Sequence, residues 1–145
     1  MEGPNEASNK ALVRRFVEEF QDQHRVEVID ELVSRDFVNR SGTVRDIPGM
    51  ERATDFDGMK EIDRMYRKSF PEQRVTIRDM AAEGDKVWTY KTFSAVHTGE
   101  FMGIAPTGRM VTIDAIDIMR VVDGKIVEHW AVQDVWGLMR QLQAL

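Results

Sequence analysis

The stretch VTIDAIDIMRVVDGKIVEHWAVQDVW, residues 111–136, decides the fold because it predicts a long β-hairpin. Two apolar-rich runs flank Asp123 and Gly124, a dipeptide that readily adopts the positive φ angles of a two-residue type I′ turn. A turn at this point places Val122 opposite Lys125 and predicts the register of the whole hairpin.

Counting outward from the turn predicts which side chains share a face. Alternate residues along a strand point to the same face, as do residues opposite one another on paired strands. Without a bulge, Asp117 lies opposite Trp130 and Ile113 lies opposite Asp134. The face expected to be buried then contains Val111, Ile113, Ala115, Asp117, Met119, Val121, Ile126, Trp130, Val132, Asp134 and Trp136.

Two aspartates on this apolar face are the clearest indication of function. A buried carboxylate is unfavourable unless it is paired, hydrogen-bonded or protonated, so it often marks a group that titrates for a purpose. In this register Asp117 and Asp134 are about 13 Å apart, at roughly 3.3 Å per residue, and can line opposite parts of one pocket. The alternative is that each aspartate only bonds a backbone amide or an arginine.

The composition is that of one ordinary globular domain. The chain has 145 residues, 42% of them hydrophobic and 31% charged, with a net charge of −5. This charge argues against nucleic acid or an anionic membrane as the main partner. The absence of cysteine excludes disulfides and thiolate chemistry, and no apolar run approaches the ~20 residues of a membrane span. We expect a cytoplasmic protein with a flexible leader at 1–7 and a single domain at 8–145.

The remaining sequence predicts helices first and strands afterwards. Apolar residues at helical spacing predict helices over about 8–23 and 26–33, and a third helix that Asp57 caps and Pro71 ends. A loop is expected at 39–57, strands at 73–82 and 87–97, an extended connection at 98–110, and a short helical tail at 138–145. This order predicts an α+β fold, with three helices packed on one face of a curved, mainly antiparallel sheet.

The other face of the hairpin is also apolar. Ile116 and Ile118 are predicted to lie there beside Val127 and Ala131, which is too much apolar area for open solvent. Because the helices cover the first face, we expect a second copy to cover this one and form a homodimer. Scattered single exposures are the alternative. The register also places His129 on this outer face, and a one-residue bulge would reverse that assignment.

Three segments resemble a known family. They are HTGEFMGIAPTGR at 97–109, IDIMRVVDGKIVEHW at 116–130, and Asp134 just beyond. With the order of helices and strands, they resemble the SnoaL-like polyketide cyclases, which belong to the nuclear-transport-factor-like superfamily of cone-shaped α+β barrels. The resemblance covers about 8–142. It implies a cofactor-free pocket between the helices and the concave sheet for a small hydrophobic or aromatic polyketide-like ligand.

The resemblance also implies chemistry and residue roles. The cyclases close a ring by intramolecular aldol condensation, with one aspartate as general acid/base, and the matching residue is taken to be Asp134. Asp117 stands where cyclases have a histidine or another polar residue, and Asn39 matches a polar position at the pocket mouth. Ketosteroid isomerase, from the same superfamily, pairs an aspartate base with a protonated acid. Asp117 is therefore predicted to be a neutral hydrogen-bond donor to an enolate.

Further candidate substrate-binding residues come from the strands. They are Trp88, Lys91, Phe93, His97, Trp130 and His129. Lys91 either pairs with a pocket carboxylate or extends its ammonium to the rim, and the rim is favoured. His97 is expected to form a structural hydrogen bond that orients the arm at 98–110.

Two classes of function remain open from the sequence. The first is an enzyme that transfers protons at carbon, namely a cyclase, an isomerase or a related lyase, with epoxide hydrolysis as a lesser variant. The second is a noncatalytic small-molecule binder or a partner-binding dimer. A metal site is not expected, because His24, His97 and His129 are the only histidines and no H-x-x-H or H-E-x-x-H spacing occurs.

Overall fold

The computed structural model describes residues 3–42 and 46–143. Its helices are α1 (Pro4–Arg15), continued by the π-helix η1 (Phe16–Asp22), α2 (Val28–Leu32), α4 (Phe56–Ser69) and α5 (Val135–Gln141). Its strands are β1 (Val33–Asn39), β2 (Arg74–Glu83), β3 (Lys86–Val96), β4 (Met110–Val122) and β5 (Lys125–Gln133). They form one sheet in the order β1-β5-β4-β3-β2, in which only the β1–β5 pair is parallel.

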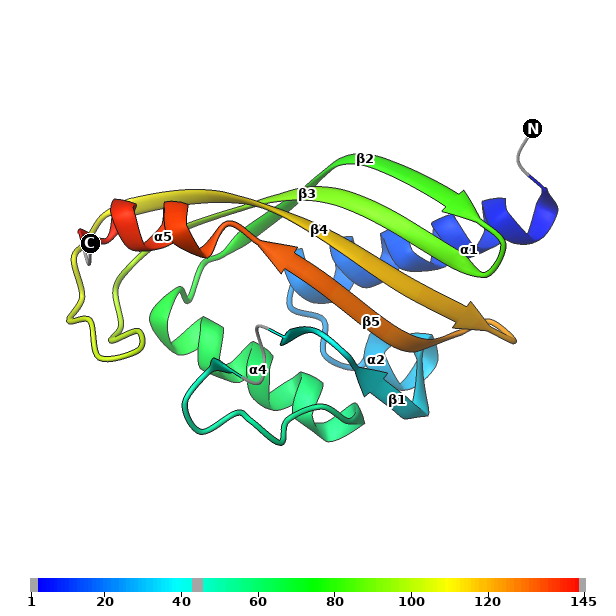
Figure 1. The fold of residues 1–145 in the computed structure, drawn as a ribbon, viewed down its shortest axis with the longest axis horizontal. Coiled ribbons are helices and arrows are strands. Elements are labelled where there is room, and N and C mark those ends of the chain that lie inside the picture. Colours follow the sequence, from blue (N-terminus) through cyan, green and yellow to red (C-terminus); the bar gives the residue numbers. More distant parts are fainter. Residues whose placement is uncertain (1–2, 43–45, 144–145) are drawn as a thin grey trace.

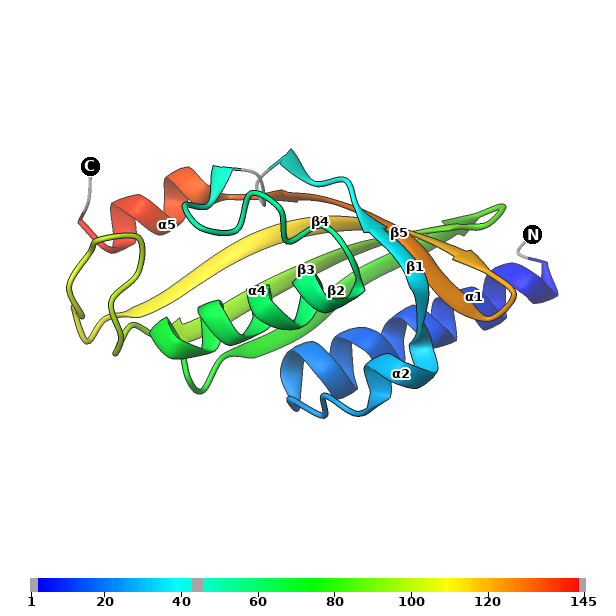
Figure 2. The same cartoon turned by 90° about the horizontal axis from the view of Figure 1, so that it is seen from below.

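The sheet curves around helices on one side (Figure 1). Seen from below, α4 lies in front of β2 and β3, α1 and α2 lie side by side at the lower right of the view, and α5 follows β5 at the end where the chain terminates (Figure 2). The main core fills the space between, and includes Val17, Leu32, Phe37, Met119 and Ile126. The predicted curved α+β architecture is confirmed. Within the described residues, no helix has the length and apolar character needed to cross a membrane.

The central hairpin turns where the sequence predicts. Asp123 and Gly124 have φ angles of 50° and 73°, as a type I′ turn requires. Val122 lies opposite Lys125, and the next inward-facing pair also follows the predicted register. Local turn chemistry therefore determines this part of the sheet.

Beyond the turn, β5 contains a bulge that the sequence analysis did not place. Val127 is an extra residue between two successive pairs of the β4–β5 ladder. An extra residue sends every later side chain to the opposite face. The predicted face assignments of Trp130, Val132 and His129 are therefore wrong: His129 lies on the concave side, and Val132 is 75% exposed on the convex side.

The other elements differ from the expectation mainly at their ends. Helix α1 begins at Pro4, because proline suits a first helical turn and Glu6 accepts the Gly3 N–H at 3.0 Å. Residues 4–7 are therefore helical rather than a leader, and residues 1–2 lie outside the described range. Helix α4 is capped by Asp55, not Asp57, since its carboxylate accepts the Gly58 N–H at 2.8 Å.

One strand was missed altogether. Residues 33–39, VSRDFVN, form β1, which pairs in parallel with β5 through Val38 opposite Glu128 and Asn39 opposite His129. A register irregularity between Val33 and Val38 breaks the regular alternation by which a strand is recognised in a sequence. This strand matters for function because it places Asn39 beside His129.

Candidate functional site

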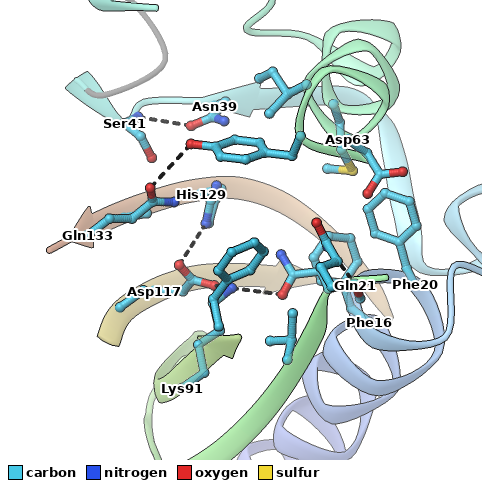
Figure 3. Close-up of a pocket in the computed structure, with 18 of the residues that line it drawn as sticks. Phe16, Phe20, Gln21, Asn39, Ser41, Asp63, Lys91, Asp117, His129 and Gln133 are labelled. Atoms are coloured by element: carbon cyan, nitrogen blue, oxygen red, sulfur yellow. Dashed lines mark hydrogen bonds and ion pairs between the residues drawn. The ribbon is translucent and has the colours of Figure 1, made fainter. Parts of the chain in front are cut away.

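A cavity of about 150 Å³ lies between the concave face of the sheet and the helices η1 and α4 (Figure 3). Much of its lining is apolar, and includes Phe16, Phe20, Phe37, Met59, Ile62, Phe93 and Ile113. The polar lining residues are Gln21, Asn39, Ser41, Asp63, Tyr66, Gln73, Lys91, Asp117, His129 and Gln133. An apolar cavity with a few convergent polar groups is the usual form of a small-molecule site.

The charged centre of the cavity comes from three neighbouring strands. Asp117 on β4 is 1% exposed, and one of its carboxylate oxygens accepts a hydrogen bond from the Lys91 Nζ of β3. The other carboxylate oxygen lies 3.3 Å from Nε2 of His129 on β5. This is an ion-pair distance, but the two groups are not aligned for a hydrogen bond. The expectation that Lys91 extends to the rim is therefore wrong, and the open alternative, pairing with a carboxylate, is observed.

The charges around Asp117 set its ionisation. Burial alone raises the pKa of Asp117, but the ammonium of Lys91, together with the contact to His129, outweighs burial and holds this pKa below the ordinary aspartate value. Asp117 is consequently a carboxylate at neutral pH. The prediction that it acts as a neutral hydrogen-bond donor is not compatible with this environment.

The ammonium of Lys91 has a second partner on η1. Its Nζ donates to Gln21 Oε1 at 2.7 Å. In a π-helix the backbone bonds join residues five apart, so Gln21 follows Phe16 on the same side and both line the cavity. Gln21 was not predicted as a site residue, because a plain α-helix was expected over this segment.

Two side chains hold the end of η1. Arg67 Nη2 donates to the backbone carbonyl oxygens of Phe20 and Gln21 at 3.2 and 2.9 Å. Gln73 Nε2 donates to the same backbone oxygen of Gln21 at 3.0 Å. These bonds satisfy carbonyls that a helix end leaves without partners. They also fix the backbone from which the Gln21 side chain reaches Lys91.

A second acidic group, Asp63 on α4, also reaches the cavity. Arg67 Nε lies 3.1 Å from both of its oxygens, and His24 Nε2 lies 3.2 Å from one of them. Burial raises the pKa of Asp63, and the charge of Arg67 offsets only part of that effect. Asp63 is thus occupied in fastening α4 to the turn after η1.

The groups beside Asn39 are polar but uncharged. Asn39 Oδ1 accepts the Ser41 N–H at 2.9 Å, and the Tyr66 hydroxyl donates to Gln133 Oε1 at 3.4 Å. Burial raises the pKa of Tyr66 to about 12, so this hydroxyl keeps its proton. Of these four residues, only Asn39 was predicted as a site residue, since nothing in the sequence around the other three indicates that they line a cavity.

The structure brings five of the predicted site residues together in the cavity. These are Asn39, Lys91, Phe93, Asp117 and His129. Four others lie elsewhere, namely Asp134, Trp88, Trp130 and His97. Among the described residues, no group of three or more His, Cys, Asp or Glu side chains is arranged to hold a metal ion.

Asp134 is exposed and lies at the start of α5. Its carboxylate accepts the Gly137 N–H at 2.8 Å, which makes it the N-cap of that helix. The predicted position of Asp134 on a buried apolar face is wrong, because β5 ends at Gln133 and the bulge has already exchanged the faces of that strand.

The two tryptophans that were predicted to bind substrate lie on the convex face of the sheet. Ile118 has Trp88 opposite it on β3 and Trp130 opposite it on β5, and the ammonium of Lys86 lies 5.4 Å from the Trp130 ring centroid. Their assignment to substrate binding is therefore wrong for this cavity. The convex position of Trp130 follows from the same bulge.

His97 is buried outside the cavity lining and holds the arm at 98–110. Its Nδ1 accepts the Thr107 N–H at 3.2 Å and lies 3.0 Å from the Thr107 hydroxyl, while Gly108 N–H donates to the His97 carbonyl at 2.8 Å. The structural role expected for His97 is confirmed, and its assignment to substrate binding is not.

Comparison with known proteins agrees with this fold. The sequence pattern of the SnoaL-like polyketide cyclase family matches residues 11–142. The nogalonic acid methyl ester cyclase of Streptomyces nogalater is 28% identical over 119 residues, covering 81% of this chain and 85% of that protein. The structure of IdmH from Streptomyces antibioticus, a proposed polyketide cyclase, has a TM-score of 0.81 and 32% identity over 93% of this chain and 98% of that one.

A further solved structure widens the comparison. AclR of Streptomyces galilaeus, a proposed hydroxylase, has a TM-score of 0.80 and 31% identity over 97% of this chain and 83% of that one. The chain belongs to the SnoaL-like polyketide cyclase family. Its relatives support a cyclase-type enzyme. Because proteins of this fold are assigned more than one activity, a particular reaction has to be inferred from the residues of the cavity.

Proposed function

We propose that this chain is a cofactor-independent cyclase that closes a ring by intramolecular aldol condensation on an uncharged aromatic polyketide ester. The observation that carries the proposal is the group formed by the buried Lys91 and Asp117 with the half-buried His129 at one side of a largely apolar cavity. Family membership supports the reaction class, and the relative named above acts, by its name, on a methyl ester.

In this proposal His129 is the general acid/base. It removes a proton from the carbon between two carbonyl groups, and the resulting electron pair attacks a second carbonyl carbon of the same molecule. A carbon–carbon bond forms, the carbonyl double bond opens, and the new alkoxide oxygen takes up a proton. Because the ring closes by aldol addition without loss of water, the product is an isomer of the substrate and no co-reactant is needed. Asp117, as a carboxylate, stabilises the imidazolium that forms when His129 accepts the proton.

Lys91 is proposed to stabilise the negative charge that develops on oxygen. An ammonium has three N–H donors, of which Gln21 and Asp117 take two. The third is available to an enolate oxygen, and a preorganised donor in a site with little water is worth more than the same donor in water. Since Asp117 already neutralises Lys91, the lining residues that the structure describes offer no unpaired lysine or arginine to a ligand carboxylate, which favours an ester.

The proposal is tested by measuring ring closure of a tricyclic aromatic methyl ester that bears a β-keto side chain. We expect His129→Gln and Asp117→Asn each to lower kcat by about 10²- to 10⁴-fold, the range of general acid/base contributions. Asp134→Asn serves as the matched acid-to-amide control outside the cavity and should retain kcat. Full turnover by His129→Gln would contradict the proposed role of this histidine.

A noncatalytic small-molecule binder is the second candidate. It is favoured by the surroundings of Asp117. Lys91 neutralises this carboxylate, and the residue that faces it from β5 is Ala131, so no second acid lies opposite Asp117. A wild-type protein that binds the tricyclic ester but leaves it unchanged, across a panel of such esters, would favour this function over the cyclase.

We also propose that two copies associate through the convex face of the sheet. Exposed apolar side chains gather there, including Tyr90 at 40%, Ile116 at 50% and Val132 at 75% exposure. Trp88, Ile118 and Trp130 adjoin them on the same face. Helices cover only the concave side, so a second copy is the simplest cover for this apolar surface.

A further inference from the structure

Ser41 places a hydroxyl group in the wall of the cavity without a partner. The residue is 3% exposed, and its Oγ has no hydrogen-bond partner among the residues that the structure describes. Figure 3 shows Ser41 beside Asn39 and on the same side of the cavity as Gln133, whose Oε1 accepts a hydrogen bond from the Tyr66 hydroxyl. A buried hydroxyl without a partner is unfavourable in the free protein, so it is a group that gains by contacting a ligand.

The backbone around Ser41 is held firmly. Asn39 Oδ1 accepts the Ser41 N–H at 2.9 Å, Asn39 N–H donates to the Thr54 oxygen at 2.7 Å, and Arg40 N–H donates to the His129 oxygen at 2.7 Å. These bonds fix the hydroxyl in place before any ligand arrives. A preorganised group of this kind loses little conformational freedom on binding.

The same bonds give the approximate distance of Ser41 from the charged centre. Asn39 lies opposite His129 in the β1–β5 ladder, and Ser41 is two residues further along. An extended chain advances about 3.3 Å per residue, so the backbone of Ser41 lies at most about 7 Å beyond His129 along the direction of β1. That separation is about the width of one to two fused six-membered rings.

Among the described residues that line the cavity, the groups beside Ser41, namely Asn39, Tyr66 and Gln133, are neutral. The Asn39 oxygen is already used by the Ser41 N–H, which leaves its NH₂ group as a donor, and the Tyr66 hydroxyl keeps its proton. The charged residues Lys91 and Asp117 belong to the neighbouring part of the cavity and pair with one another. Neutral donors suit an uncharged oxygen, such as a quinone, ketone or ester carbonyl, and do not compensate a carboxylate.

We infer that Ser41 is a ligand-binding residue that holds an uncharged carbonyl oxygen of a fused-ring ligand, one to two rings away from the carbon that reacts at His129. The inference rests on the proposed function, because it concerns the same cavity. Beyond the proposed function, it names the residue that orients the far end of the ligand. It also names the chemical class of the group bound there.

The test compares two tricyclic probes of matched shape, 9,10-anthraquinone and anthracene, of which only the first carries carbonyl oxygens. Anthracene binding is followed by its fluorescence, and anthraquinone binding by competition. We expect Ser41→Ala to reduce the preference for anthraquinone over anthracene about tenfold. The matched control is Thr89→Val, which also deletes a buried hydroxyl without a partner, but at a residue outside the cavity lining. This control should leave the preference unchanged.

Thermal unfolding separates ligand binding from a structural role. Removing an unpartnered hydroxyl should leave the Tm of the free Ser41→Ala protein unchanged or raised, whereas loss of a structural hydrogen bond would lower it. An unchanged anthraquinone preference in Ser41→Ala, or failure of both probes to bind the wild type, would overturn the inference. The loss of turnover in Asp117→Asn is independent of this result, so the cyclase proposal can stand if the Ser41 inference fails.

Discussion

Asp117 on β4 faces Ala131 on β5, because Val127 adds one residue to β5 between the turn and this pair. A regular ladder would place Trp130 opposite Asp117 instead. The same shift brings His129 to the concave side, where its Nε2 lies 3.3 Å from the Asp117 carboxylate. One inserted residue therefore decides which ionisable groups meet in the cavity.

Removing the charge of Asp117 should destabilise the protein as well as inactivate it. Asp117→Asn leaves the buried Lys91 ammonium without its counter-charge, and breaking a buried pair from one side costs about 3–5 kcal/mol. We expect the free energy of unfolding in urea to fall by about this amount.

Removing both charges separates stability from function. The double variant Lys91→Met with Asp117→Leu should recover most of the lost unfolding free energy, because apolar residues of similar size often replace a buried ion pair without loss. It should still fail to close the ring of the tricyclic ester. Recovery of turnover in this variant would show that the pair is only structural.

The same ion pair should make stability fall in acid. Burial raises the pKa of Asp117, but Lys91 and His129 outweigh burial and leave this pKa lower in the folded state than its ordinary value of about 3.9. A lowered carboxyl pKa adds stability that is fully present above about pH 5 and is lost as the pH falls through and below the ordinary value. Urea unfolding of wild type and Asp117→Asn between pH 7 and pH 3 should show their difference shrinking as the pH falls. A pH-independent difference would argue against an ionised Asp117.

Asp134 should behave as a helix cap rather than as a catalytic acid. Asp134→Ala removes the acceptor of the Gly137 N–H and should lower the free energy of unfolding by about 1 kcal/mol, whereas Asp134→Asn, which also caps helices well, should cost less. Both variants should keep kcat near the wild-type value. A loss of turnover in Asp134→Asn without a loss of stability would restore Asp134 as a catalytic candidate.

Gln21 should act as a positioning residue for Lys91. Gln21→Leu removes the acceptor 2.7 Å from Nζ, and we expect kcat to fall about tenfold and the pH–rate profile to change, because a lost hydrogen bond to a charged group is worth roughly 1.5–3 kcal/mol. Gln23→Leu, at an exposed residue just after the same helix, is the matched control. Equal effects of the two substitutions on kcat would contradict the role of Gln21.

A charge on the convex face should prevent dimerisation. Val132→Glu places a carboxylate at a residue that is 75% exposed in the single chain, and it should convert a dimer to a monomer in sedimentation or light scattering. Met102→Glu, at another exposed apolar residue on the arm at 98–110, should leave the association unchanged. A wild-type protein that remains monomeric at high concentration would rule out the proposed dimer.

Much of the fold could be read from local sequence signals. The turn at Asp123 and Gly124 follows from two residues that accept positive φ angles, and apolar periodicity located α4 and the strands β2 to β4 to within a few residues. Strand β1 was missed because a register irregularity interrupts its pattern. The cap of α4 was misplaced by two residues, since Asp55 and Asp57 are both suitable cap residues.

Less of the site could be predicted, and the reasons are physical. Asp117 was found because an acid in an apolar run is visible in the sequence. Its partner Lys91 was named, but no local signal distinguishes a lysine that pairs in the interior from one that reaches the rim. Gln21 and Ser41 were not found, because an uncharged polar residue becomes a candidate only when its neighbours from other elements are known.

The amino-acid sequence alone determined the family, the order of helices and strands, the position of the hairpin turn and the presence of an acid on a core strand. These features depend on residue types and short-range spacing. The tertiary structure decided which side of β5 faces the cavity, and therefore that His129 and not Asp134 approaches Asp117. The reason is the bulge at Val127: the side chains of a strand alternate with a period of two, so a single extra residue exchanges its faces.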